Sequence, residues 1–174
     1  MIQNNYEGAP QKPIGSGFNA TSTTDDVIKG FDLKGKIAIV TGGNTGIGSE
    51  TVRTLSKAGA TIIVPARDVE KAKKNLEGIA NVEIEELDLI DPSSIDVFAR
   101  KFLASGSLLH LLINNAGIMF VPLRRDAKGD ESQLTTNYLA YISSGREPCG
   151  TMTGDLESPT GAACITAPGV SPVV

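Results

Sequence analysis

Aromatic, cysteine and histidine residues are scarce in this chain. Of its 174 residues 5% are aromatic, none is tryptophan, one is histidine and two are cysteines, Cys149 and Cys164. So few rings argue against a stacking platform for bases or sugars, and two cysteines argue against a disulfide framework or a zinc site. The net charge of −4 and the pI of about 5.0 offer no basic surface. We therefore expect no nucleic-acid partner and no bound metal.

Long apolar runs are absent as well. The longest, SLLHLLINNAG at 107–117, is far too short to span a bilayer. The first 15 residues, MIQNNYEGAPQKPIG, contain no apolar core of a secretory signal. We therefore expect a cytoplasmic protein with no membrane partner. The hydrophobic content of 40% is nevertheless enough to supply a sizeable core.

From Lys36 onward, strand-like and helix-like segments alternate. Asp68 and Asp91 are expected to cap the second and third of the helices. This alternation predicts an α/β fold, a Rossmann-type doubly wound parallel sheet with helices on both faces, whose ligands bind outside the carboxyl ends of the strands. The expected strands are KIAIV, TIIVPA, VEIEELDL and LLHLLINN, at 36–40, 61–66, 82–89 and 108–115.

Composition divides the chain into three parts. Residues 1–33 are polar and rich in Gly and Pro, and we expect an N-terminal extension with one short helix capped by Thr24. Residues 34–141 carry the alternation and form the expected α/β domain. Residues 142–174 contain repeated Gly and Pro, which predicts an irregular tail. The first four strands are then recognisable and the C-terminal strands are missing, so the fourth strand should have an unpaired edge.

A glycine-rich loop, TGGNTGIG at 41–48, follows the first strand. Glycines permit a tight turn, and the helix that begins there directs N–H groups and its dipole at an anion. The common G-x-G-x-x-G spacing is absent. The Walker loop fits only in part, because Ser49 and Glu50 replace its Lys and Ser/Thr. The pattern T-G-x-x-x-G-x-G does fit, which indicates a phosphate or pyrophosphate site, with a plain strand–helix turn as the alternative.

A second motif, NNAG at 114–117, follows the fourth strand. With this motif and the glycine loop together, the chain resembles the short-chain dehydrogenase/reductase family from about residue 31 to residue 141. The stretches PARDVEKA at 65–72 and LDLIDPSSI at 87–95 are most similar to its retinol-dehydrogenase-like branch. The resemblance implies that residues 34–141 are an NAD(P)-binding Rossmann domain.

The resemblance also implies roles for individual residues. Asn137 matches the helix asparagine of the family's catalytic tetrad, with an ordinary polar helix residue as the alternative. Residues similar to those that flank the adenine are Asp88 and Leu89, and residues similar to those beside the nicotinamide ribose are Asn115, Ala116 and Gly117. Residues similar to those that line the pyrophosphate and ribose are Thr41, Gly42, Asn44, Thr45, Gly46, Ile47 and Gly48.

The end of the second strand bears on the choice of cofactor. A carboxylate there would bind a ribose 2′-hydroxyl, whereas an arginine accommodates a 2′-phosphate. Ala66 is followed by Arg67, whose planar fork suits a phosphate, and so we favour NADP over NAD. Asp68 complicates this prediction, although capping the next helix is its expected role. Thr45 stands where many NADP-preferring members carry a basic residue.

The proton-transfer residues of the family are not found. They are a tyrosine, a lysine four residues later that lowers its pKa, and a serine on the fifth strand. The chain has three tyrosines, Tyr6, Tyr138 and Tyr141, and none begins a Tyr-x-x-x-Lys. Tyr138 and Tyr141 are expected to be packing residues on the helix of Asn137. The serine belongs by spacing near 164–166, where AACITAPG is a poor strand.

Two explanations of the tail stay open: two compensating frameshifts that bracket roughly residues 142–170 in a truncated gene, or natural divergence. The sequence thus predicts the cofactor-binding portion of a short-chain oxidoreductase. It would transfer a hydride between NADP(H) and a small-molecule carbonyl or alcohol, and we expect no turnover by this chain. The alternatives are a non-catalytic dinucleotide-binding module and a non-functional gene fragment. Substrate identity and homo-oligomerisation stay open.

Overall fold

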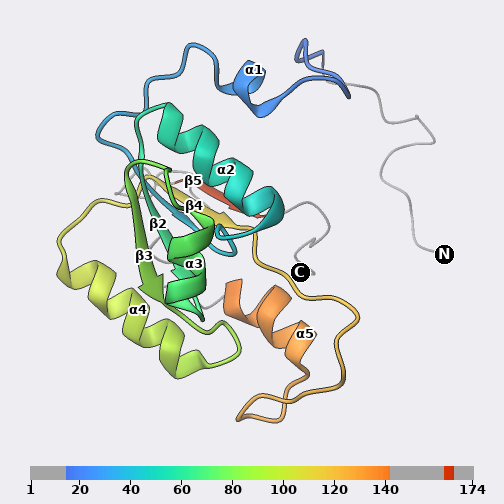
Figure 1. The fold of residues 1–174 in the computed structure, drawn as a ribbon. Coiled ribbons are helices and arrows are strands. Elements are labelled where there is room, and N and C mark those ends of the chain that lie inside the picture. The colour runs from blue at the N-terminus through green and yellow to red at the C-terminus, as the bar shows by residue number, and fades with distance from the viewer. Residues whose placement is uncertain (1–14, 142–162, 167–174) are drawn as a thin grey trace.

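The computed structural model describes residues 15–141 and the backbone of residues 163–166. Its centre is one parallel sheet in the order β3-β2-β1-β4-β5 (Figure 1). Each neighbouring pair of strands runs parallel, so the predicted Rossmann-type parallel sheet is confirmed. The strands are β1 (Ile37–Val40), β2 (Thr61–Ala66), β3 (Val82–Glu86), β4 (Leu111–Asn114) and β5 (Ala163–Thr166).

Helices cover both faces of this sheet, because alternate strand residues point to opposite sides. On one face Ala38 and Val40 pack with Val52 of α2 and with Leu76 at the end of α3. On the other face Ile39 belongs to a cluster that includes a side chain of α4. The helices are α1 (Thr24–Ile28), α2 (Gly46–Lys57), α3 (Val69–Asn75), α4 (Pro92–Ala104) and α5 (Ser132–Leu134), the last continued by the π-helix η1 (Thr135–Leu139).

Within residues 34–141, α3 and α4 begin and α2 ends at the capping residues that the sequence predicts. The Asp68 carboxylate accepts the N–H of Lys71 at the start of α3. Asp91 likewise caps α4, with Pro92 at the first helical position. Gly59 ends α2 with a φ of 97°, a left-handed conformation that favours glycine. These predicted helix boundaries are confirmed.

Two expectations at the ends of the chain are wrong. The cap of α1 is Thr23, whose hydroxyl and Asp26 form a reciprocal capping box, and the expected Thr24 is already helical. The fourth strand also has no free outer edge, because β5 pairs with it from Leu111 to Asn114. An apolar strand with unpaired N–H and C=O groups is a strong template for another strand, and this outweighs the weak strand propensity of 163–166. The rest of the predicted tail lies outside the described residues.

The N-terminal extension is attached to the domain through α2. Thr24 donates its hydroxyl hydrogen to Glu50 at 2.6 Å, and Arg53 donates to the same carboxylate at 2.8 Å. Asp25 in turn pairs with Arg53 at 3.4 Å and with Lys57 at 3.1 Å. Hydrogen bonds from Arg53 and then Thr24 lower the pKa of Glu50 to about 2. This charged network connects α1 with α2.

Candidate cofactor-binding site

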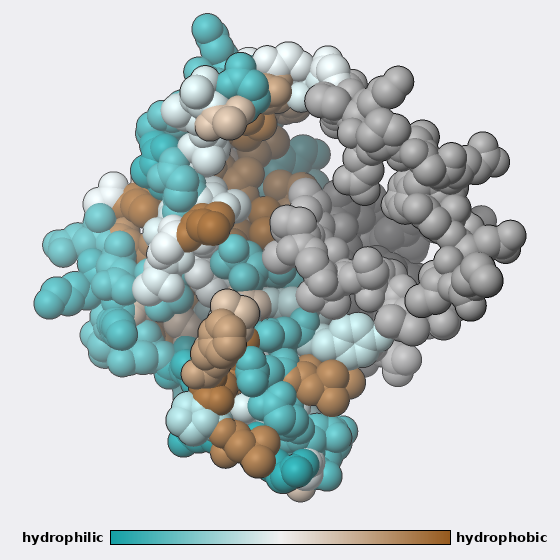
Figure 2. All heavy atoms as spheres, turned by 90° about the vertical axis from the view of Figure 1, so that its right-hand side faces the viewer, coloured by the Kyte–Doolittle hydropathy of each residue, from teal (hydrophilic) through white to brown (hydrophobic). Residues whose placement is uncertain are grey.

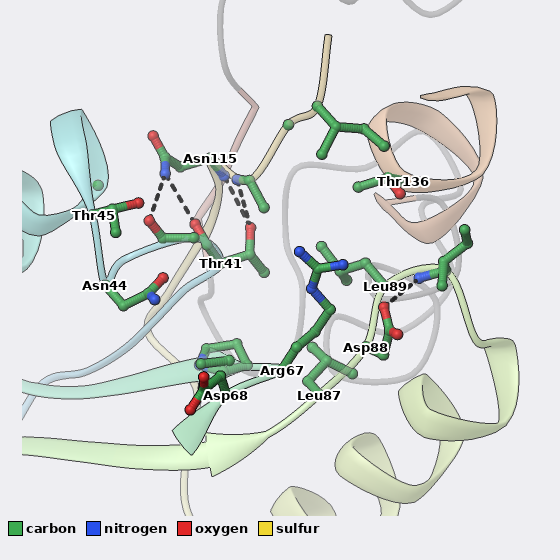
Figure 3. A pocket seen from close by; sticks show the side chains of 18 of the residues that line it. Thr41, Asn44, Thr45, Arg67, Asp68, Leu87, Asp88, Leu89, Asn115 and Thr136 are labelled. Carbon is green, nitrogen blue, oxygen red and sulfur yellow. Dashed lines mark hydrogen bonds between the residues drawn. The ribbon is translucent and has the colours of Figure 1, made fainter. Parts of the chain in front are cut away.

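A cavity of about 930 Å³ opens at the carboxyl ends of the strands (Figure 3). This volume is in the range of sites for cofactors and drug-sized ligands. Most of its wall comes from four segments: the loop after β1, the end of β2, the segment after β3 and the segment after β4. Single side chains of α3, α5 and η1 complete it. This is the edge at which doubly wound sheets bind their ligands.

Most of the predicted cofactor residues line this one cavity. Gly46 lies in the same loop without forming part of the wall. Contacts between the predicted residues and a cofactor stay predictions. The predicted residues on the wall are Thr41, Gly42, Asn44, Thr45, Ile47, Gly48, Arg67, Asp88, Leu89, Asn115, Ala116 and Gly117.

Thr41 joins the end of β1 to the end of β4. Its buried hydroxyl oxygen accepts the backbone N–H of Asn115 at 3.0 Å and that of Ala116 at 3.1 Å. The Asn115 side-chain amide returns a hydrogen bond to the Thr41 carbonyl at 3.0 Å, and the dashed lines of Figure 3 trace this exchange. These hydrogen bonds therefore connect the glycine loop and the NNAG segment in one continuous wall.

Close backbone approach explains the glycines of this wall. A Cβ on Gly48 would lie 2.2 Å from the Gly42 carbonyl oxygen, and a Cβ on Gly42 would lie 2.9 Å from the Cα of Ala116. The first turn of α2 is thereby held against the loop. Thr45, its N-cap, makes no side-chain capping bond. Backbone N–H groups and the helix dipole at this end suit a phosphate.

Cationic side chains from three segments line the cavity. In the view of Figure 3, the Arg67 side chain extends from the end of β2 into the space between Thr41 and Leu89. Lys71 of α3 and Arg124 of the loop after β4 add two further cations to the wall. Sequence reasoning missed both, along with Ser132 and Thr136. The spacing of Lys71, four residues after Arg67, was an available signal, whereas nothing local marks Arg124.

The segment after β3 forms the lower wall. Asp88 accepts the N–H of Ile90 at 3.1 Å, and its own N–H donates to the Ser94 hydroxyl at 2.9 Å. The neighbouring Leu87 and Leu89 are buried, so the wall is apolar on both sides of Asp88. Such a wall is suited to one face of an aromatic base.

Asn137 lies beside the cavity on the π-helix η1. Its side-chain oxygen accepts the N–H of Ile118 at 2.9 Å, and its amide nitrogen donates to the Ile118 carbonyl at 2.8 Å. Both ends of the amide therefore hold the loop that follows β4. Short π-helical turns are frequent at functional sites. Asn137 does not itself line the cavity.

Tyr141 follows the same helix and packs on the cluster that contains Leu87, Leu89 and Ile95. Burial raises the pKa of the Tyr141 phenol, and a hydrogen bond with Thr41 opposes this in part. A catalytic tyrosine of the resembling family needs a shift in the other direction. The environment of Tyr141 thus agrees with the expected packing role.

Over 15–141 no helix is long and apolar enough to cross a membrane. In the same part of the chain, no group of three or more His, Cys, Asp or Glu side chains is placed to hold a metal ion.

The chain is similar in sequence to retinol dehydrogenases. Mouse retinol dehydrogenase 11 is 44% identical over 116 residues, which cover 63% of this chain and 37% of that protein. Human retinol dehydrogenase 11 is 41% identical over 145 residues, which cover 79% of this chain and 43% of that protein. The chain therefore spans less than half the length of these relatives.

Solved structures agree with the sequence relatives. A metagenomic short-chain oxidoreductase in complex with NADP matches with a TM-score of 0.66 and 26% identity, over 81% of this chain and 66% of that one. Pseudomonas aeruginosa RhlG, in an NADP active-site complex, matches with a TM-score of 0.59 and 28% identity, over 68% and 48%. The model of the short chain dehydrogenase family matches residues 36–160. The expected resemblance to the retinol-dehydrogenase-like branch is thus confirmed, and the chain belongs to the short-chain dehydrogenase family.

Proposed function

We propose that this chain is the cofactor-binding portion of an NADP(H)-preferring oxidoreductase whose substrate is a small-molecule carbonyl or alcohol. The observation that carries the proposal is Arg67, which stands at the end of β2 inside the cavity. An arginine there accommodates a 2′-phosphate, whereas NAD enzymes place a carboxylate on the 2′-hydroxyl. Both structural relatives described above were solved as complexes with NADP, which supports the same choice.

The walls of the cavity fit the parts of a dinucleotide. The glycine loop and the first turn of α2 would hold the pyrophosphate, because backbone N–H groups are available there. The apolar wall around Asp88 would hold the adenine, and the segment from Asn115 to Gly117 would lie beside the nicotinamide ribose. The bound nicotinamide supplies the hydride chemistry. The chain's own contribution is to orient this cofactor and to exclude water from one side of it.

Lys71 strengthens the case for a 2′-phosphate. It lies on the cavity wall within the first turn of α3, four residues after Arg67. The competing carboxylate, Asp68, is used as the cap of α3, where it accepts the Lys71 N–H at 2.9 Å. Two cations and an engaged carboxylate favour a phosphate dianion over a neutral hydroxyl.

The tyrosine and lysine that would carry out the proton transfer are not found in this chain. No Tyr-x-x-x-Lys occurs in the 174 residues, and the pKa of Tyr141 is raised by burial. Both the oxygen and the nitrogen of the Asn137 side-chain amide form hydrogen bonds with Ile118. We therefore assign Asn137 a positioning role for the cavity wall. We propose that the chain binds the cofactor without turnover. The second candidate is a non-catalytic dinucleotide-binding module, which the same observations favour.

The test is thermal unfolding of the full chain with NADPH and with NADH. NADPH at a hundred times its Kd should stabilise the fold by about 2.7 kcal/mol, and NADH at the same concentration should stabilise it less. Arg67→Ala should abolish the advantage of NADPH and leave the NADH shift in place. Arg100→Ala, which removes an exposed arginine of α4, is the matched control.

Two results would contradict the proposal. An unchanged NADPH shift in Arg67→Ala would remove the 2′-phosphate assignment. Carbonyl-dependent oxidation of NADPH by the parent chain would refute the absence of turnover and separate an enzyme from a binding module.

A further inference from the structure

The exposed end of α3 is bonded to the glycine loop. The Asn75 side-chain amide donates to the backbone carbonyl of Asn44 at 3.2 Å, and the two residues are 31 positions apart in the chain. Hydrophilic side chains cover much of the described surface drawn in Figure 2, so an exposed asparagine is ordinary by itself. Its hydrogen bond is specific, because Asn44 lines the cofactor cavity while Asn75 lies outside the wall.

Both ends of this hydrogen bond rest on the same part of the core. Leu76, which follows Asn75, is buried in the cluster that contains Val40 and Val52. The glycine loop packs on that cluster too, since a Cβ on Gly43 would lie 2.8 Å from the Val52 side chain. The bond therefore joins two segments that are already held in place, so little conformational entropy is lost when it forms.

The same face of α3 also carries a cation of the cavity. Lys71 and Asn75 are four residues apart on α3, so they lie on one face of the helix. Lys71 lines the cavity together with Arg67. In the view of Figure 3, Asn44 and Arg67 extend into the cavity from the loop after β1 and from the end of β2. Asn75 thus connects the glycine loop to the segment that holds the cations proposed for the 2′-phosphate.

We propose that Asn75 is a positioning residue for the 2′-phosphate of NADP(H). By holding the Asn44 carbonyl, it sets the separation between the glycine loop and α3. A 2′-phosphate would occupy the space between these two segments, whereas NAD(H) has only a hydroxyl there and depends less on their separation. This inference rests on the proposed function, since it concerns the same cofactor.

Substitutions at Asn75 separate positioning from a general effect on the helix. Alanine is a stronger helix former than asparagine, so Asn75→Ala removes the hydrogen bond without weakening α3. Asn75→Gln keeps the amide donor on a longer side chain and is the rescue variant. Lys74→Ala, at the preceding exposed position of the same helix, is the matched control.

The first experiment is calorimetric titration of the full chain with NADPH and with NADH. We expect Asn75→Ala to weaken NADPH binding about fivefold, the usual effect of one hydrogen bond, and to change NADH binding by less than about twofold. Asn75→Gln should bind NADPH more tightly than Asn75→Ala does. Lys74→Ala should keep the ratio of the two affinities within about twofold of the parent. Thermal unfolding of each variant verifies that it is folded.

The second experiment is amide hydrogen exchange without any cofactor, which tests the positioning of the loop by itself. Asn75→Ala should exchange about fivefold faster than the parent over residues 41–48 and at the same rate over β1. Lys74→Ala should leave both segments unchanged. Unchanged exchange over 41–48 in Asn75→Ala would overturn the inference whatever the cofactor preference is.

The outcomes of the titrations distinguish the inference from the proposed function. A parent chain that binds NADPH no more tightly than NADH removes the proposed cofactor preference, and the inference with it. A parent that prefers NADPH, with the same ratio of affinities in Asn75→Ala, overturns the inference alone. Equal losses for both cofactors in Asn75→Ala also overturn it, because they indicate a general structural role.

Discussion

At the scale of the residue, Thr41 has a role that the sequence did not indicate. Its place in the glycine loop predicts contact with a cofactor, yet its hydroxyl also holds two N–H groups of the NNAG segment, up to 75 residues away in the chain. Local patterns cannot predict such a contact, because it depends on two strands that pair only in the folded sheet. Arg124 of the cavity wall was missed for the same reason, because no local pattern marks it.

Phe120 provides a prediction at this scale. Phe120→Gly should raise the free energy of unfolding by up to about 1 kcal/mol, because glycine adopts a φ of 55° without the steric cost that a side chain incurs. Chemical denaturation of the two proteins measures the difference. Asn81→Gly is the matched control, since Asn81 has the same φ of 55° and asparagine tolerates it better. A loss of stability in Phe120→Gly would show that the phenyl ring packs in solution.

At the scale of the element, features that depend on residues close together in the sequence were predictable, and features that depend on distant residues were not. The caps of α3 and α4 were predicted because each depends on a side chain and an N–H two or three residues later. The pairing of β5 was not predicted, because it depends on the edge of β4 and only weakly on the residues 163–166 themselves. The contact of Asn137 with Ile118 was not predicted either, because it joins the π-helix η1 to a loop 19 residues earlier in the chain.

The contact between α2 and the glycine loop leads to the second prediction. Gly48→Ala places a Cβ within 2.2 Å of the Gly42 carbonyl, so the helix must shift by more than its neighbours allow. We expect a loss of roughly 2 kcal/mol in stability and no thermal shift with NADPH. Gly117→Ala, whose Cβ would meet Asn137 alone among the described residues, at 3.6 Å, should stay within about 0.5 kcal/mol of the parent. Comparable losses in both variants would contradict this explanation.

At the scale of the whole molecule, the fold class was predictable from the alternation of apolar runs and helical segments. This holds because a parallel sheet covered on both faces needs apolar residues at nearly every strand position. The attachment of the N-terminal extension was not predictable. It depends on the ion pairs of Asp25 with Arg53 and Lys57 on another helix, about 30 residues away.

This attachment should depend on pH. The pKa of Glu50 is about 2 in the folded chain and near 4.5 when unfolded, so its contribution to stability is present above pH 4.5 and is lost as the pH falls towards 2. Glu50→Gln should therefore lower the melting temperature slightly at neutral pH, and the difference should vanish near pH 2. Glu77→Gln, at an exposed carboxylate, is the control. A difference between parent and Glu50→Gln that persists near pH 2 would exclude the ionised carboxylate as its source.

The central place of β1 in the sheet has a kinetic consequence. β1 pairs with β2, which follows soon after it, and also with β4, which is made more than 70 residues later. The walls of the cavity therefore meet only after long-range pairing is complete, which is a late event in folding. If NADPH binds there, it should slow unfolding while the refolding rate stays the same, and stopped-flow measurements with and without NADPH can test this. The cofactor would then extend the lifetime of the native state without guiding the chain towards it.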